Sequence, residues 1–136
     1  MSASLAKEFR IDSEADIVLA RRLVRDAATN LGFGLTDVTR IVTAASELTR
    51  NIYVYARSGT MHLQPVETAG RTGLELLFVD QGPGIPDIEK AMQPGYSTNK
   101  SMGMGMPGSK RLMDEMLVQS EVGKGTTVMV RKWLRK

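Results

Sequence analysis

The chain has 136 residues, 42% of them hydrophobic and 24% charged, which suits one soluble domain with a modest core. No stretch approaches the roughly 18 apolar residues of a membrane span, and the start has no apolar leader. We therefore expect a cytoplasmic protein with no membrane partner. The lack of cysteine excludes disulfides and thiolate metal sites.

The net charge of +3 is unevenly placed along the chain. The last six residues, RKWLRK, hold four of the 18 basic groups, which leaves 14 basic against 15 acidic groups in the rest. The few aromatic residues do not cluster into a stacking surface. A basic tail on a nearly neutral body does not favour nucleic-acid binding, and no nucleic-acid partner is expected.

The first part of the chain predicts a strand and two helices. Lys7–Ile11 has the composition of a short strand, and Ser13 with Asp16 forms an S-x-x-D helix start signal. Apolar residues then recur at helical spacing as far as Gly32, a typical C-terminal stop. A second helix is predicted to begin near Thr36 and to end by residues 58–59.

The middle of the chain predicts a hairpin followed by a long loop. Residues 61–67 and 74–79 are expected to pair across a turn at 70–73, and the second strand is apolar enough to be central in a sheet. Residues 81–108 contain four of the five prolines and six of the 13 glycines, which is typical of a loop. A short helix around residues 87–92 is compatible with this composition.

The last part predicts a helix over residues 109–116 and a hairpin formed by residues 117–121 and 126–133. No internal repeat or linker divides the chain, so residues 1–136 are expected to form a single domain. The predicted fold class is α/β: a two-layer α/β sandwich with a mixed, mostly antiparallel sheet and helices on one face.

The segment 103–108, GMGMPG, spells the dinucleotide-binding fingerprint G-x-G-x-x-G. That fingerprint requires a buried strand directly before its first glycine. Here the preceding residues 93–101 read as a loop, and the chain is too short after residue 103 for the rest of such a fold. NAD binding is therefore rejected, and the glycines require another explanation.

A second glycine-rich segment follows the apolar strand, where Asp80 precedes Gly82 and Gly84. A carboxylate at a strand end beside a glycine turn can accept a hydrogen bond from an exocyclic amine, such as that of adenine. A tight loop in which Asp80 merely caps the turn explains the same residues equally well.

Glu47 and Asn51 lie four residues apart in the second predicted helix, on one face and away from its apolar stripe. An asparagine oxygen suits Mg²⁺, and a nearby glutamate can take a proton from an attacking hydroxyl. Taken alone, the pair is better explained as two ordinary solvated residues, and only its combination with the other motifs favours a site.

Four short motifs occur in a fixed order: ELTRN at 47–51, DQGPG at 80–84, GMG at 103–105 and GKGTT at 123–127. This order resembles the nucleotide-binding boxes of the GHKL (Bergerat-fold) ATPases, the family of gyrase B and the histidine kinases. The runs SELTRNIYVYA, DQGPGIPDI and MPGSKRLMDE are similar to those of the anti-sigma-factor-type serine/threonine kinases within that family. The resemblance spans nearly the whole chain.

The resemblance implies a role for each matching position. Glu47 would be the catalytic base, and Asn51 would bind both ATP and Mg²⁺. Asp80 would accept a hydrogen bond from the adenine amino group, with Thr126, or less favourably Thr127, in support. Gly82 and Gly84 would give the base room.

The third box, Gly103-Met104-Gly105-Met106, would contact the ATP phosphates under the same resemblance. Met106 stands where relatives often carry leucine or phenylalanine. Lys100 is the nearest candidate for the γ-phosphate contact that an arginine makes in some relatives, and Lys110 and Arg111 remain alternatives.

The resemblance further implies an enzyme that uses Mg-ATP to phosphorylate a STAS-domain protein, such as a stressosome scaffold, in a bacterial partner-switching stress response that regulates a sigma factor. A second partner, such as a phosphatase regulator, is also implied. The alternative is a nucleotide-gated module that binds a regulator without phosphoryl transfer.

Two further features have two interpretations each. Arg21, Arg22 and Arg25 lie on one side of the first predicted helix, as a solvated face or as a docking surface for an acidic partner. Trp133 either packs against the sheet or anchors an external contact, and packing is the favoured interpretation.

Overall fold

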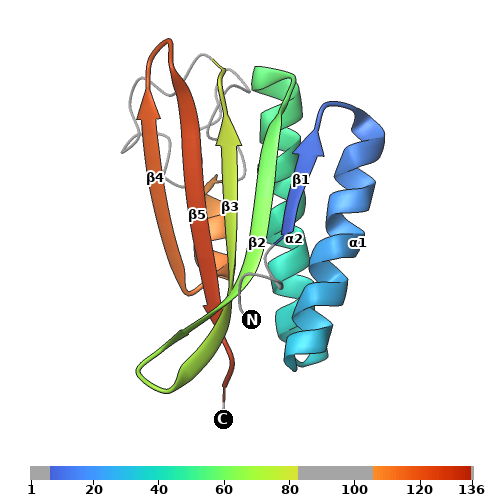
Figure 1. The fold of residues 1–136 in the computed structure, drawn as a ribbon, viewed down its shortest axis with the longest axis vertical. Coiled ribbons are helices and arrows are strands. Elements are labelled where there is room, and N and C mark those ends of the chain that lie inside the picture. The colour runs from blue at the N-terminus through green and yellow to red at the C-terminus, as the bar shows by residue number, and fades with distance from the viewer. Residues whose placement is uncertain (1–6, 83–105, 136) are drawn as a thin grey trace.

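A computed structural model describes residues 7–82 and 106–135 of the chain (Figure 1). The elements in chain order are β1 (Lys7–Ile11), α1 (Glu14–Leu31), α2 (Leu35–Asn51), a π-helical turn η2 (Ile52–Ala56), β2 (Gly59–Thr68), β3 (Arg71–Asp80), α4 (Met106–Leu112), β4 (Glu115–Glu121) and β5 (Gly125–Trp133). None of the described helices is long and apolar enough to cross a bilayer.

The five strands form one sheet in the order β1-β2-β3-β5-β4, and the helices lie on one of its faces (Figure 1). This arrangement confirms the predicted two-layer α/β sandwich and the central place of β3. Every pairing among the described strands is antiparallel, so the parallel part of the predicted mixed sheet is not found there. Tight turns account for the antiparallel pairs β2–β3 and β4–β5, whereas longer connections join β1 to β2 and β3 to β5.

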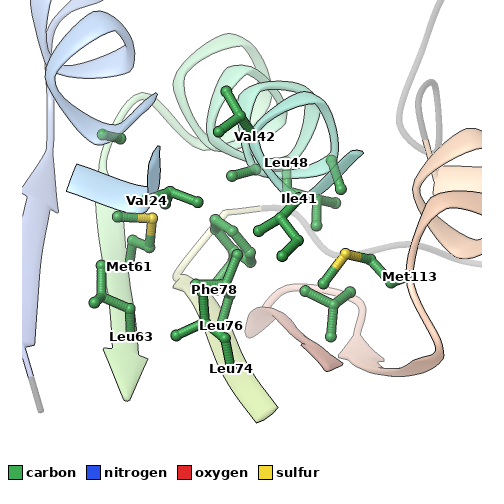
Figure 2. Packing of buried hydrophobic residues seen from close by; sticks show 14 of the residues in the cluster. Val24, Ile41, Val42, Leu48, Met61, Leu63, Leu74, Leu76, Phe78 and Met113 are labelled. Carbon is green, nitrogen blue, oxygen red and sulfur yellow. The ribbon is translucent and has the colours of Figure 1, made fainter. Parts of the chain in front are cut away.

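The core lies between the helices and the helix-facing side of the sheet. Alternate residues of β3, namely Leu74, Leu76 and Phe78, are buried, as the two-residue period of a strand requires. Figure 2 shows Ile41 of α2 pointing toward these side chains. Buried residues of α1, β2 and β5 also belong to the cluster: Ala20, Val24, Ala28, Met61, Leu63, Val128 and Val130.

Helix α1 begins and ends where the sequence signals predict. Gly32 adopts φ 107° after the last turn, and the N–H groups of Gly32 and Phe33 donate to the carbonyls of Thr29 and Ala28. This is a Schellman motif, which favours glycine because of its left-handed conformation. At the start, the Asp16 carboxylate accepts the Asp12 N–H at 3.0 Å, and this bond lowers the Asp16 pKa.

The helix predicted over residues 109–116 is wrong in its extent. Helix α4 ends at Leu112, and the following residues from Glu115 onward belong to β4. In the sequence, the apolar residues 112, 113 and 116 have the spacing of a helical face. In the structure, contacts with β5 end the helix after Leu112. The Lys132 Nζ donates to the Leu112 carbonyl at 2.8 Å, and the Asp114 N–H donates to the Arg131 carbonyl at 2.9 Å.

The predicted turn at 70–73 is also shorter than expected. Only Ala69 and Gly70 form the turn, and both have positive φ. Strand β2 extends to Thr68, and strand β3 begins at Arg71. The short helix expected near residues 87–92 lies outside the described residues.

The C-terminal residues form an ion-paired cluster rather than a free basic tail. The Lys132 side chain is only 4% exposed and lies 3.6 Å from Asp114 and 3.8 Å from Asp37 at the start of α2. Arg135 pairs with the same two carboxylates. Trp133 is buried, which confirms the packing interpretation, and its indole N–H donates to Glu115 at 2.7 Å.

The core assignment predicts a large difference between two leucines of the sheet. Leu76→Ala removes a fully buried side chain and should lower the free energy of unfolding by about 2–5 kcal/mol. Leu117→Ala, at a strand position that is 52% exposed, should cost less than about 1 kcal/mol. Urea unfolding of both variants measures this, and equal losses would contradict the described layers.

Candidate functional site

The end of the central strand β3 places Asp80 between two neighbouring strands. Asp80 is opposite Gly59 of β2 and opposite Thr126 of β5. Its carboxylate Oδ1 accepts the Gly82 N–H at 2.8 Å. The capping bond considered from the sequence is therefore present. It occupies only part of the acceptor capacity of a carboxylate, which has about four lone-pair sites.

The environment of Asp80 disfavours its charge. Burial raises the pKa of this carboxyl above its ordinary value of 3.8, and the backbone N–H groups of Gly82 and Thr126 partly oppose the rise. A carboxylate held in a desolvated position with spare lone pairs is suited to accepting hydrogen bonds from a ligand.

Close backbone packing fixes the loops on both sides of Asp80. Gly125 has φ 113°, and a Cβ there would collide with the backbone carbonyl oxygen of Asp80. A Cβ on Gly82 would come within 2.7 Å of the Ala56 Cβ. Position 125 therefore requires glycine because of its positive φ and because its backbone lies against Asp80. Position 82 requires glycine only because its backbone lies close to Ala56. The missing Cβ of Gly82 makes room for η2.

A hydroxyl pair lies next to the carboxylate. Thr126, which is 8% exposed, has its Oγ1 2.8 Å from the Ser120 Oγ. Directly opposed residues of an antiparallel pair project from the same face, so Thr126 shares the face of Asp80, and Thr127 projects from the other. The geometry thus favours Thr126 over Thr127. Sequence reasoning missed Ser120, since only the register of the last hairpin brings it here.

An open pocket of about 290 Å³ lies at this end of the sheet. Its lining includes Asp80, Ser120, Gly125 and Thr126, together with Val79, Gln119 and Thr127, which project from the other face of the sheet. Small-molecule sites begin at about 300 Å³, so the pocket is close to the size needed for a small ligand.

Helix α2 carries Glu47 and Asn51 toward the same end. Both residues are half-buried at the flank of a buried stripe, so neither is an ordinary solvated residue. Asn51 is the last residue of α2, where the helix widens into η2. The sequence gives no signal for this π-helical turn, and such turns are frequent at functional sites.

The turn η2 joins the helix end to the strand end. The Ile52 Cγ2 would lie 2.8 Å from a Cβ on Gly59, and Ala56 packs against Gly82, as described above. Because Gly59 and Gly82 flank Asp80, these contacts hold the Glu47–Asn51 end of α2 beside the Asp80 end of β3.

The described residues contain no group of three or more His, Cys, Asp or Glu side chains that could hold a metal ion. Magnesium often keeps several waters and binds through one or two protein oxygens together with substrate phosphates. A single amide ligand such as Asn51 is compatible with that mode. Five predicted phosphate and base contacts, Gly84, Lys100, Gly103, Met104 and Gly105, lie outside the described residues, and Met106 begins α4.

A protein-family model described as a histidine kinase-like ATPase domain matches residues 11–132, nearly the whole chain. The chain belongs to this family. Its predicted resemblance to the GHKL ATPases is therefore confirmed.

Individual relatives narrow the placement within the histidine kinase-like ATPases. The chain is 52% identical over 126 residues to the serine/threonine-protein kinase RsbT of Bacillus subtilis (strain 168), covering 93% of this chain and 95% of that protein. It is 34% identical over 122 residues to the anti-sigma F factor of Geobacillus kaustophilus, covering 86% and 84%. The first match covers nearly all of both chains and supports assignment to the protein serine/threonine kinases.

A solved structure shares the fold. The RsbU and RsbW domains of Rv1364c from Mycobacterium tuberculosis match with a TM-score of 0.60 at 17% identity, over 96% of this chain and 33% of that one. This match supports the two-layer architecture and carries no argument about ligands.

The raised pKa of Asp80 predicts a pH-dependent stability effect in nucleotide-free protein. Asp80→Asn keeps an acceptor for the Gly82 N–H but removes the charge. Because the folded state holds the Asp80 proton more tightly than the unfolded state, the wild type loses stability relative to the variant as the pH rises from about 3.8 through the raised pKa. The variant should therefore gain in relative free energy of unfolding between pH 3 and pH 7.

Urea titrations of the wild type and Asp80→Asn at both pH values measure this difference. A difference in unfolding free energy that stays constant, or that shifts in favour of the wild type as the pH rises, would contradict the desolvated carboxylate.

Proposed function

We propose that the chain uses Mg-ATP to phosphorylate a serine of a STAS-domain regulatory protein in a bacterial partner-switching pathway of the stress response. The observation that carries the proposal is the convergence of Asp80, the Ser120–Thr126 hydroxyl pair and the Glu47–Asn51 end of α2 at one end of the sheet. The 52% identity to a serine/threonine-protein kinase supports the reaction class.

In this proposal the adenine ring occupies the Asp80 end of the sheet. The Asp80 carboxylate accepts from the exocyclic amine, since its bonds to backbone N–H groups leave lone pairs free. The bond between the Ser120 and Thr126 hydroxyls would hold Thr126 in place opposite Asp80. Gly84 is proposed to give the base room, whereas the space left by the missing Cβ of Gly82 is taken by Ala56 of η2.

The phosphates follow the path from Asp80 toward Glu47. Asn51 is the proposed magnesium ligand, and a bound magnesium ion would supply charge compensation for the phosphate oxygens. Gly103, Met104, Gly105 and Met106 are proposed to contact the phosphates, with Lys100 meeting the γ-phosphate.

Glu47 is the proposed general base. Its carboxylate takes the proton from the serine hydroxyl of the partner as the serine oxygen forms a bond to the γ-phosphorus. The bond from that phosphorus to the β–γ bridging oxygen breaks, and ADP leaves. Phosphoserine is the product, and Glu47 later releases its proton to solvent.

The alternative is a nucleotide-gated module that binds a regulator without phosphoryl transfer. Its support is the 34% identity to an anti-sigma F factor, a protein named for acting against a sigma factor. A second partner such as a phosphatase regulator, and a cytoplasmic location, are part of the proposal in either form.

The base assignment predicts the result of a kinase assay. Purified protein, ATP and Mg²⁺ are incubated with a STAS-domain protein from the same organism, and mass spectrometry locates the phosphate. Wild type should label one serine. Glu47→Gln should reduce the rate at least about 100-fold, because a positioned general base contributes that much, while ATP still binds. Glu67→Gln, an exposed glutamate far along β2, is the matched control.

Labelling that survives Glu47→Gln at the wild-type rate would remove Glu47 from the base role. Partner binding that depends on ATP but yields no phosphoserine with the wild type would favour the binding module.

A further inference from the structure

A buried cation joins three elements at the end of β5 that lies away from Asp80. Lys132 is almost fully buried on the helix-facing side of this strand. The two preceding residues on that side, Val128 and Val130, are buried and apolar. Burying an ammonium group is costly unless several partners surround it. Packing of the core alone therefore does not explain a lysine at this position, and its contacts have to be considered one by one.

The contacts of Lys132 are of two kinds. Its ammonium lies near the carboxylates of Asp37 and Asp114, and the exposed Arg135 pairs with the same two groups at 3.7 and 3.5 Å. Both carboxylates thus have a second cationic partner. The contact that Lys132 adds is its 2.8 Å hydrogen bond to the Leu112 carbonyl, at the end of α4.

Helix α4 is short enough to depend on such a bond. It has seven residues, Met106–Leu112, and helices shorter than about 12 residues are marginal without tertiary contacts. The last carbonyls of a helix have no partner within it, and a cation there also complements the helix dipole. The Lys132 ammonium meets both needs at Leu112, so it fixes the C-terminal end of α4.

The other end of α4 leads into the proposed phosphate contacts. Met106 is the first residue of α4, and residues 103–106 are proposed above to contact the ATP phosphates. A helix of this length spans about 10 Å, so a shift at Leu112 carries over to Met106. A misplacement of about 1 Å near reacting groups can lower a rate about 100-fold. The bond to Leu112 can therefore affect the phosphates although Lys132 lies at the far end of β5 from Asp80.

We propose that Lys132 is a positioning residue for the nucleotide: its bond to Leu112 holds α4 so that Met106 and residues 103–105 meet the phosphates. The proposal rests on the proposed kinase function and adds to it a residue that acts on ATP without touching it. A purely structural Lys132 would affect the stability of the fold and leave the affinity for ATP unchanged.

Calorimetric titration with Mg²⁺ and a non-hydrolysable ATP analogue tests the effect on the nucleotide. Lys132→Met should weaken binding about tenfold, because the charge-assisted bond that positions α4 is lost. Lys132→Arg keeps a cationic donor and should restore most of the affinity. Arg135→Gln is the matched control, since it removes a cation from the same two carboxylates and leaves the Leu112 bond in place. This control should bind the analogue as the wild type does.

Amide hydrogen exchange in nucleotide-free protein gives a second readout. The Met113 N–H donates to the Ser109 carbonyl at 3.1 Å and closes the last turn of α4. It should exchange at least about tenfold faster in Lys132→Met than in the wild type, because α4 opens more often. The Phe33 N–H, which closes the end of α1, should keep its wild-type rate. A loss of global stability alone would change both rates.

An unchanged affinity of Lys132→Met for the analogue would overturn the positioning role, as would an equal loss in Arg135→Gln. If Lys132→Met does not fold, Lys132→Gln, which keeps a polar group beside the two carboxylates, is judged by the same criteria. A wild type that does not bind the analogue would contradict the proposed kinase function instead. The exchange rates would then decide on their own whether Lys132 holds α4.

Discussion

The pairing of Gly59, Asp80 and Thr126 across three strands is the constraint on which the site depends. It puts one carboxylate at the end of the central strand and small residues on both sides. The Gly125 backbone lies against the Asp80 carbonyl with no room for a side chain, so only glycine fits at the start of β5. The β4–β5 register then places Ser120 opposite Thr126, and Gly82 leaves room for η2.

The two ends of the sandwich differ in how a buried ionisable side chain is held. At the Asp80 end, burial raises the pKa of a carboxyl, which disfavours its charge in the folded protein. At the other end of β5, buried Lys132 meets Asp37, Asp114 and the Leu112 carbonyl. Those contacts tie β5 to the start of α2 and the end of α4. The start of α2 and the end of α4 are thus anchored away from the site. Glu47 and Asn51 lie at the opposite end of α2.

Local signals in the sequence predicted the elements that local interactions determine. Strand β1 and helix α1 follow from alternation, helical spacing and the Gly32 stop. The end of α4 could not be predicted, because Lys132, twenty residues away, accounts for it. Likewise, η2 and Ser120 depend on packing against Gly59 and Gly82 and on hairpin register. The approach of Asp80 to Thr126 came from family resemblance and not from residue spacing, since the two residues are 46 positions apart in the chain.

The central claim is that an adenine nucleotide binds beside Asp80. Two-dimensional amide NMR of isotope-labelled protein, titrated with ADP and Mg²⁺, tests it most directly. The N–H groups of Gly82 and Thr126 bond to the carboxylate, and Gly125 packs against the Asp80 backbone, so each amide reports on this position individually. The account predicts that these three amide signals shift most among the described residues and saturate together. Signals at these positions that stay unchanged, while the protein remains folded and ADP is in large excess, would contradict it.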